Sequence, residues 1–103
     1  MSWQFVIHPR ASDQLAALPP DVDERIRQKL KEMVTNEWRE LHDYDVEHIR
    51  GCDHEIYRTR IGEYRVFFLA EKPVAAILHV AKRGRAYGST EQLDSRADDF
   101  ETG

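Results

Sequence analysis

The chain begins with a regular alternation of side chains. Large apolar residues occupy every second position at Trp3, Phe5 and Ile7. A period of two predicts a strand with one strongly apolar face. Pro9 follows and favours a break after this strand.

Helical spacing replaces the alternation after this break. The segment from Ala11 to Leu18 has the composition of a helix, which Pro19 and Pro20 end. Pro20 also suits the first position of a second helix, because acidic residues follow in its first turn. The apolar residues of this second helix keep helical spacing: Val22, Ile26, Leu30, Met33 and Val34.

Three short strand-like segments follow a charged, irregular stretch that ends near Gly51. They are Glu55–Ile61, Tyr64–Glu71 and Val74–Ala81. Gly62 and Glu63 predict a tight, glycine-first hairpin between the first two segments. Short connections favour antiparallel neighbours. We therefore expect an α+β fold with an N-terminal strand, a two-helix hairpin and an antiparallel three-stranded meander. The helices should cover one face of the sheet and leave the other open.

Length and composition indicate one domain. With 103 residues, 41% hydrophobic and 33% charged, the chain fits a single soluble globular unit. We expect a domain over residues 1–90 and an acidic, flexible tail over residues 91–103. An alternative is that the tail folds back over the basic face as an internal mask. No apolar run has the length of a membrane helix, no signal-peptide pattern is present, and a single cysteine forms no internal disulfide, so the expected location is the cytoplasm.

The net charge of −4 hides an uneven distribution. Residues 1–50 carry 7 basic and 10 acidic side chains, and residues 91–103 carry 1 basic and 5 acidic. Residues 51–90 instead carry 7 basic and 4 acidic side chains, a local charge of +3. The positive charge therefore lies in the predicted strands, between two acidic regions.

Basic side chains recur along the predicted strands and just after them. They are Arg58, Arg60, Arg65, Lys82, Arg83 and Arg85, with the phenol of Tyr87 behind them. Side chains two positions apart share one face of a strand. This rule assigns five residues to the open face: Arg58, Arg60, Arg65, His79 and Arg83. A shift of one residue in register would invert the assignment. Converging guanidiniums with a phenol are suited to gripping a phosphate backbone.

In these residues the sequence resembles the RelE/ParE superfamily, which comprises toxins of toxin–antitoxin systems. The resemblance covers roughly residues 3–88, and its most specific portion is IYRTRIGEYRVFFLA, followed after a short strand by AKRGRAY. The opening strand and the LAALPPDV joint between the helices also match. The retained arginines and Tyr87 look more like the RelE branch than the ParE branch.

The RelE branch implies an enzyme, a metal-independent endoribonuclease that cleaves mRNA at the ribosome and inhibits translation. Its implied partners are a cognate antitoxin, the ribosome and mRNA, with no membrane and no cofactor. The chain would then be a monomer or part of a toxin–antitoxin hetero-oligomer. The ParE branch instead implies a DNA gyrase inhibitor. A third alternative is a non-catalytic member that binds only RNA or an antitoxin-like partner.

By this resemblance, Arg65, Arg83 and Tyr87 are catalytic positions. The two arginines would stabilise charge on the phosphorane, and the phenol would stack on a base or orient the 2′-OH. Arg58 and Arg60 stand where relatives often carry lysines. An arginine, with a pKa above about 12, is a poor general base, which leaves that role unassigned.

His79 and Lys82 are the nearest titratable candidates for a general base. A histidine titrates near neutrality, so we assign His79 to the catalytic set. The remaining basic residues are assigned to RNA binding: Arg58, Arg60, Lys82 and Arg85.

Simpler interpretations exist for each of these residues. The arginines would also suit a solvated sheet face paired with acids such as Glu55 or Glu63, and Tyr87 would also suit the edge of the core. His42, His48, His54 and Cys52 lie near one another in sequence. Their spacings match no standard zinc pattern, and we expect no metal.

Overall fold

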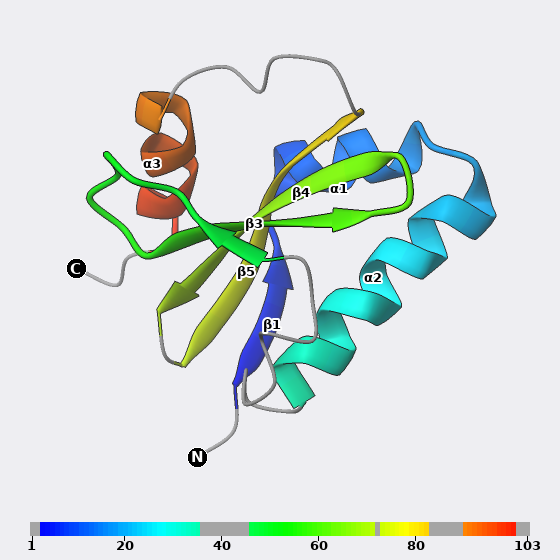
Figure 1. The fold of residues 1–103 in the computed structure, drawn as a ribbon, viewed down its shortest axis with the longest axis horizontal. Coiled ribbons are helices and arrows are strands. Elements are labelled where there is room, and N and C mark those ends of the chain that lie inside the picture. The colour runs from blue at the N-terminus through cyan, green and yellow to red at the C-terminus, as the bar shows by residue number, and fades with distance from the viewer. Residues whose placement is uncertain (1–2, 36–45, 72, 83–89, 101–103) are drawn as a thin grey trace.

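The computed structural model describes residues 3–35, 46–71, 73–82 and 90–100 and has an α+β architecture (Figure 1). The elements are β1 (Gln4–Ile7), α1 (Pro9–Ala16), α2 (Pro20–Thr35), β2 (Val46–His48), β3 (Ile56–Ile61), β4 (Tyr64–Glu71), β5 (Val74–Lys82) and α3 (Thr90–Asp98). The five strands form one mixed sheet in the order β1-β5-β4-β3-β2.

The meander expected from the short connections is confirmed. Strands β3, β4 and β5 pair antiparallel with their sequence neighbours. Gly62 has a φ of 60°, as a glycine-first hairpin turn requires. β1 lies beside β5 and pairs with it in parallel, from Gln4 opposite Val74 to Ile7 opposite Ile77.

The prolines act as helix starts. Pro9 occupies the first turn of α1, and the His8 side chain caps the helix by accepting a hydrogen bond from the Arg10 amide at 3.1 Å. The helix therefore begins two residues earlier than the predicted Ala11. The α2 helix begins at Pro20 as predicted, with Asp21 and Asp23 in its first turn.

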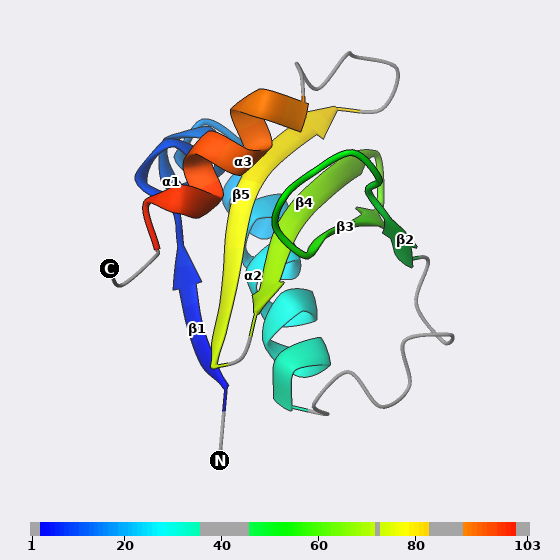
Figure 2. The same cartoon turned by 90° about the vertical axis from the view of Figure 1, so that its left-hand side faces the viewer.

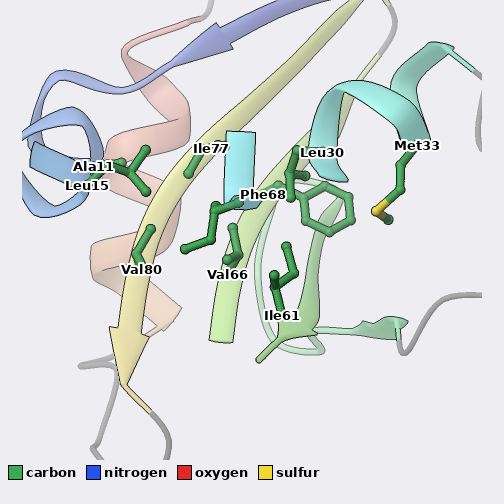
Figure 3. Packing of buried hydrophobic residues seen from close by; sticks show 10 residues of the cluster. Ala11, Leu15, Leu30, Met33, Ile61, Val66, Phe68, Ile77 and Val80 are labelled. Atoms are coloured by element: carbon green, nitrogen blue, oxygen red, sulfur yellow. The ribbon is translucent and has the colours of Figure 1, made fainter. Parts of the chain in front are cut away.

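Helices α1 and α2 cover one face of the sheet, which we call the first face. The core beneath them is built from apolar side chains (Figure 3). It combines side chains of the helices and the sheet: Ala11, Leu15, Ile26, Leu30, Met33, Ile61, Val66, Phe68, Ile77 and Val80. Burial of these residues is the main force that holds the helical hairpin to the strands.

The expectation of a flexible acidic tail is wrong over the residues that form α3. This helix lies on the opposite side of the sheet from α2 (Figures 1 and 2). Leu93 and Ala97 are buried against a second apolar core. The strand residues of that core are Ile56, Phe67, Leu69, Ala76, Leu78 and Ala81. The acidic residues of the segment are compatible with a helix because its apolar residues are four apart and share one face.

The expectation of an open second face is consequently wrong where α3 covers the sheet. The helix packs on β5 and on Phe67 and Leu69 of β4. The segment does fold back onto the sheet, but α3 covers apolar side chains there and does not mask the basic residues as the alternative proposed. The charged stretch before β3 also contains an unpredicted short strand, β2, which pairs antiparallel with β3.

Two histidines hold α3 in place through acidic residues at its end and just beyond it. His54, only 7% exposed, contacts Glu71 Oε1 at 3.0 Å through Nδ1 and Asp98 Oδ1 at 2.7 Å through Nε2. His8 Nε2 lies 2.6 Å from Asp99 Oδ2. Because both ring nitrogens of His54 face carboxylates, the doubly protonated ring is the favoured form. Hydrogen bonding to Asp98 and to Glu71 outweighs burial and raises the pKa of His54 from 6.5 to about 9.

Replacing His54 with glutamine should give a pH-dependent loss of stability. The pKa is higher in the folded protein than in the unfolded chain, so the stabilisation is fully present below pH 6.5 and is lost as pH rises through about 9. Because both carboxylates are partly exposed, we expect the variant to lose about 1–3 kcal/mol of unfolding free energy at pH 6 and much less at pH 10. Urea unfolding of both proteins across this range measures the difference.

His48→Gln is the matched control, since His48 is 47% exposed and contacts Glu55 at 3.4 Å on the sheet surface. Its unfolding free energy should stay within about 0.5 kcal/mol of the wild type. If the unfolding free energies of wild type and His54→Gln differ by the same amount from pH 6 to pH 10, a protonated His54 between the two carboxylates does not stabilise the fold.

Candidate functional site

Two arginines stand side by side at the end of the sheet where β3 meets β4. Arg60 is directly opposite Arg65, and Arg65 is directly opposite Ala81 of β5. The next row along the strands holds Arg58, Phe67 and His79. Phe67 and Ala81 belong to the core beneath α3, so both rows lie on the second face of the sheet. The shared face predicted for Arg58, Arg60, Arg65 and His79 is therefore confirmed.

A bulge in β5 keeps His79 on this face. Phe67 is opposite His79, whereas Phe68 is opposite Ile77, so Leu78 is an extra residue. Such an insertion shifts the alternation of side chains within one strand. Leu78 and His79 consequently both lie on the α3 side, where the Phe67 and His79 rings are 5.8 Å apart.

The surroundings of His79 do not favour a general base. Its Nδ1 lies 2.9 Å from Arg96 Nη1 and 3.2 Å from Gln14 Nε2. An arginine only donates hydrogen bonds, so Nδ1 must carry its lone pair and accept. Burial, with the nearby Arg96 charge, lowers the pKa of His79. The ring is neutral near pH 7, and the nitrogen that would take a proton is already engaged.

Arg96 is a residue that the sequence analysis missed. It is 8% exposed, and its Nη1 also donates to the Leu78 carbonyl at 2.8 Å. This contact joins α3 to the bulge in β5. The spacing of Leu93, Arg96 and Ala97 was the available signal, since all three share one side of a helix.

Arg58 forms the ion pair that the simpler interpretation predicted, although with a different acid. Its guanidinium contacts Glu47, the residue directly opposite on β2. Glu55 instead accepts a hydrogen bond from the Tyr57 hydroxyl at 3.1 Å. The positive charge of Arg58 is therefore partly neutralised on the sheet surface.

Arg65 differs from Arg58 in its surroundings. Among the described residues its side chain forms neither a hydrogen bond nor an ion pair, and this side chain is half-buried. Arg60, its neighbour on β3, is exposed. This end of the second face thus carries two arginines on adjacent strands, whose side chains are long enough to reach a single phosphate group.

Lys82 lies apart from this pair. It ends β5 opposite Tyr64, on the first face, and is exposed. The predicted site residues Arg83, Arg85 and Tyr87 lie outside the described residues, as does His42. The chain leaves β5 one position beyond the row of Arg60, Arg65 and Ala81.

No metal-binding cluster of His, Cys, Asp and Glu occurs in the part of the chain that the structure describes. The described helices also include none long and apolar enough to cross a membrane.

The chain matches no family model. It is 28% identical over 89 residues to a Methanocaldococcus jannaschii protein described as "Putative toxin RelE1", and the match covers 84% of this chain and 97% of that relative. The fold is similar to RelE in the archaeal RelE–RelB complex from Pyrococcus horikoshii, with a TM-score of 0.68 and 28% identity. That match covers 84% of this chain and 100% of the other.

Two further solved structures share the fold at 18% identity. The RelB–RelE complex from Methanococcus jannaschii has a TM-score of 0.62 and covers 75% of this chain and 88% of the other. A free E. coli RelE with two arginines replaced by alanine has a TM-score of 0.66 and covers 98% of this chain and 100% of the other. In its sequence and in its fold, the chain is therefore similar to the archaeal RelE toxins.

Proposed function

We propose that this protein is the toxin of a type II toxin–antitoxin system and a metal-independent endoribonuclease that cleaves mRNA at the ribosome and inhibits translation. One observation carries the proposal furthest. Arg65, whose side chain has no hydrogen bond or ion pair among the described residues, stands beside Arg60 at the sheet end from which the chain continues toward Arg83. This arrangement suits a phosphate group better than a purely structural role.

Cleavage of RNA without a metal uses the adjacent 2′-OH as nucleophile. Negative charge then builds up on the non-bridging oxygens of the phosphorane, and permanently charged guanidiniums stabilise it. We assign this role to Arg65 and, from the family resemblance, to Arg83. Tyr87 would stack on a base or orient the 2′-OH. Arg60, Lys82 and Arg85 would hold neighbouring phosphates.

Proton transfer has weaker support than phosphate binding. Arg58 is paired with Glu47, and Nδ1 of His79 accepts from Arg96 and Gln14. These contacts favour a second candidate function, a RelE-like protein that binds RNA or an antitoxin without cutting. Mapping of transcript ends distinguishes the two candidates.

An antitoxin is the proposed protein partner. The Pyrococcus horikoshii and Methanococcus jannaschii structures are complexes of RelE with RelB. We infer that this chain also pairs with an antitoxin. Because residues 51–90 carry a net positive charge, the partner surface that meets them should be acidic.

Replacing Arg65 with alanine should abolish cutting and leave the fold intact. Removing a donor that stabilises transition-state charge costs about 100- to 1,000-fold in rate. We expect inducible wild type to arrest growth and leave cut transcripts, and Arg65→Ala to leave transcripts whole. Sequencing of transcript 5′ ends measures the cuts.

Arg27→Ala is the control, because Arg27 lies on α2 and pairs with Asp23 four residues earlier. It should cut as the wild type does. Arrested cells with intact transcripts would rule out the nuclease. Loss of DNA supercoiling in those cells would indicate a gyrase inhibitor instead.

His79→Gln should preserve the pH dependence of cleavage. Glutamine retains an acceptor for Arg96 but has no titratable group. Loss of a true general base costs about 100-fold or more, so we expect a much smaller drop in rate and an unchanged profile between pH 5.5 and 8. Cleavage of mRNA on purified ribosomes measures both quantities. A 100-fold loss with a flattened pH profile would instead identify His79 as the base.

A further inference from the structure

A hollow lies between the first turns of α2 and the turn that joins β3 to β4. It has a volume of about 230 Å³. Six residues line it: Val22, Arg25, Ile61, Gly62, Glu63 and Tyr64. The ribbon views place the β3–β4 turn beside the start of α2 (Figure 1). The hollow is separate from the proposed phosphate-binding pair, Arg60 and Arg65, and no role has yet been assigned to it.

The charged groups of the hollow are not paired with each other. Within the described part of the chain, Arg25 and Glu63 form no ion pair or hydrogen bond, and both side chains are exposed. Arg25 nevertheless lies close to the turn, since a Cβ added to Gly62 would be 3.4 Å from its Nη1. The guanidinium of Arg25 is therefore within van der Waals range of the turn.

The other surfaces of the hollow are apolar or aromatic. Val22 is half-buried and Ile61 is buried, and the half-buried Tyr64 contributes a phenol ring. A flat ring with polar edges could stack on Tyr64, accept hydrogen bonds from the Arg25 guanidinium and donate one to the Glu63 carboxylate.

The hollow is adjacent to the proposed phosphate grip. Ile61 and Tyr64 are opposite each other, one step along the strands from the pair of Arg60 and Arg65. Their side chains point to the first face, so the hollow lies around the end of the sheet from Arg65. Lys82 is opposite Tyr64 on the side of the hollow. Cations thus flank both sides of this end of the sheet.

We propose that this hollow binds an unpaired base of the RNA strand whose phosphate Arg65 holds, with Glu63 accepting a hydrogen bond from the exocyclic amino group of the base. The inference rests on the proposed RNA substrate and adds a specificity residue to it. Arg25 or Tyr64 supplies the stacking surface. An ionised carboxylate only accepts hydrogen bonds, so the exocyclic amino groups of adenine, cytosine and guanine fit this position. Uracil presents carbonyl oxygens at its exocyclic positions, which the carboxylate repels, and its only donor is the ring N3–H.

The test measures binding separately from cleavage. Full-length wild type is titrated against fluorescent uniform oligonucleotides of adenine, cytosine or uracil at low salt, with anisotropy as the readout. The oligonucleotides carry 2′-O-methyl groups, which remove the nucleophile and prevent cutting. We expect the adenine and cytosine oligonucleotides to bind about tenfold more tightly than the uracil oligonucleotide.

Glu63→Gln is the decisive variant. A glutamine amide donates as well as accepts, so the uracil oligonucleotide should then bind within about threefold of the others. Glu32→Gln makes the same chemical change at an exposed position of α2 outside the hollow and should keep the wild-type preference. Both positions are exposed, and thermal unfolding verifies that the variants fold.

Each outcome decides the inference. It is overturned if wild type binds all three oligonucleotides equally or not at all, or if Glu63→Gln keeps the full preference. If Glu63→Gln keeps the base preference but loses the antitoxin in co-purification, the hollow is a protein-docking site and the inference is wrong. Base preference in a protein that cuts no transcript would support the inference and reject the nuclease. If the protein cuts transcripts but shows no base preference, the nuclease is supported and the inference about the hollow is rejected.

Discussion

Burial of β5 on both faces is the constraint on which the rest of the structure depends. The strand pairs with β1 on one side and β4 on the other, and its residues from Ala75 to Leu78 are all buried. Helix α1 packs against one face of β5 and α3 against the other. A strand covered on both sides needs an apolar run, which VAAIL supplies. Without α3, Phe67, Leu69 and Leu78 would be exposed to water.

Docking of α3 also decides which part of the second face can meet a ligand. The helix covers the β5 side, where Arg96 reaches the bulge at Leu78 and engages His79. The pair of Arg60 and Arg65 lies at the hairpin end of the same face. One face is therefore divided between an apolar core and a charged end. The arginines remain accessible at the place where the chain leaves β5.

The net negative charge of the chain does not conflict with a phosphate grip. Several of the acids on and beside α3 have partners within the protein. Asp98 and Asp99 contact His54 and His8, and Asp94 accepts hydrogen bonds from the Asp53 and His54 amides at 2.9 and 3.1 Å. These carboxylates hold the helix in place, whereas the guanidiniums of the hairpin end act over a short range. Screening in salt makes the local charge more important than the total for a bound phosphate.

Local sequence determined the meander and the face of its arginines. Alternation marks each strand, and Gly62 sets a turn of two residues, which in turn sets the register of Arg60 against Arg65. Only the tertiary structure decided the parallel place of β1, the bulge at Leu78, the pairing of Arg58 with Glu47 and the docking of α3. Each of these joins segments far apart in the chain or depends on which surfaces must be covered. The periodic pattern of a sequence predicts which side of a helix or strand is apolar. It does not predict which other element covers that side, because this depends on burial and strand pairing between segments far apart in the chain.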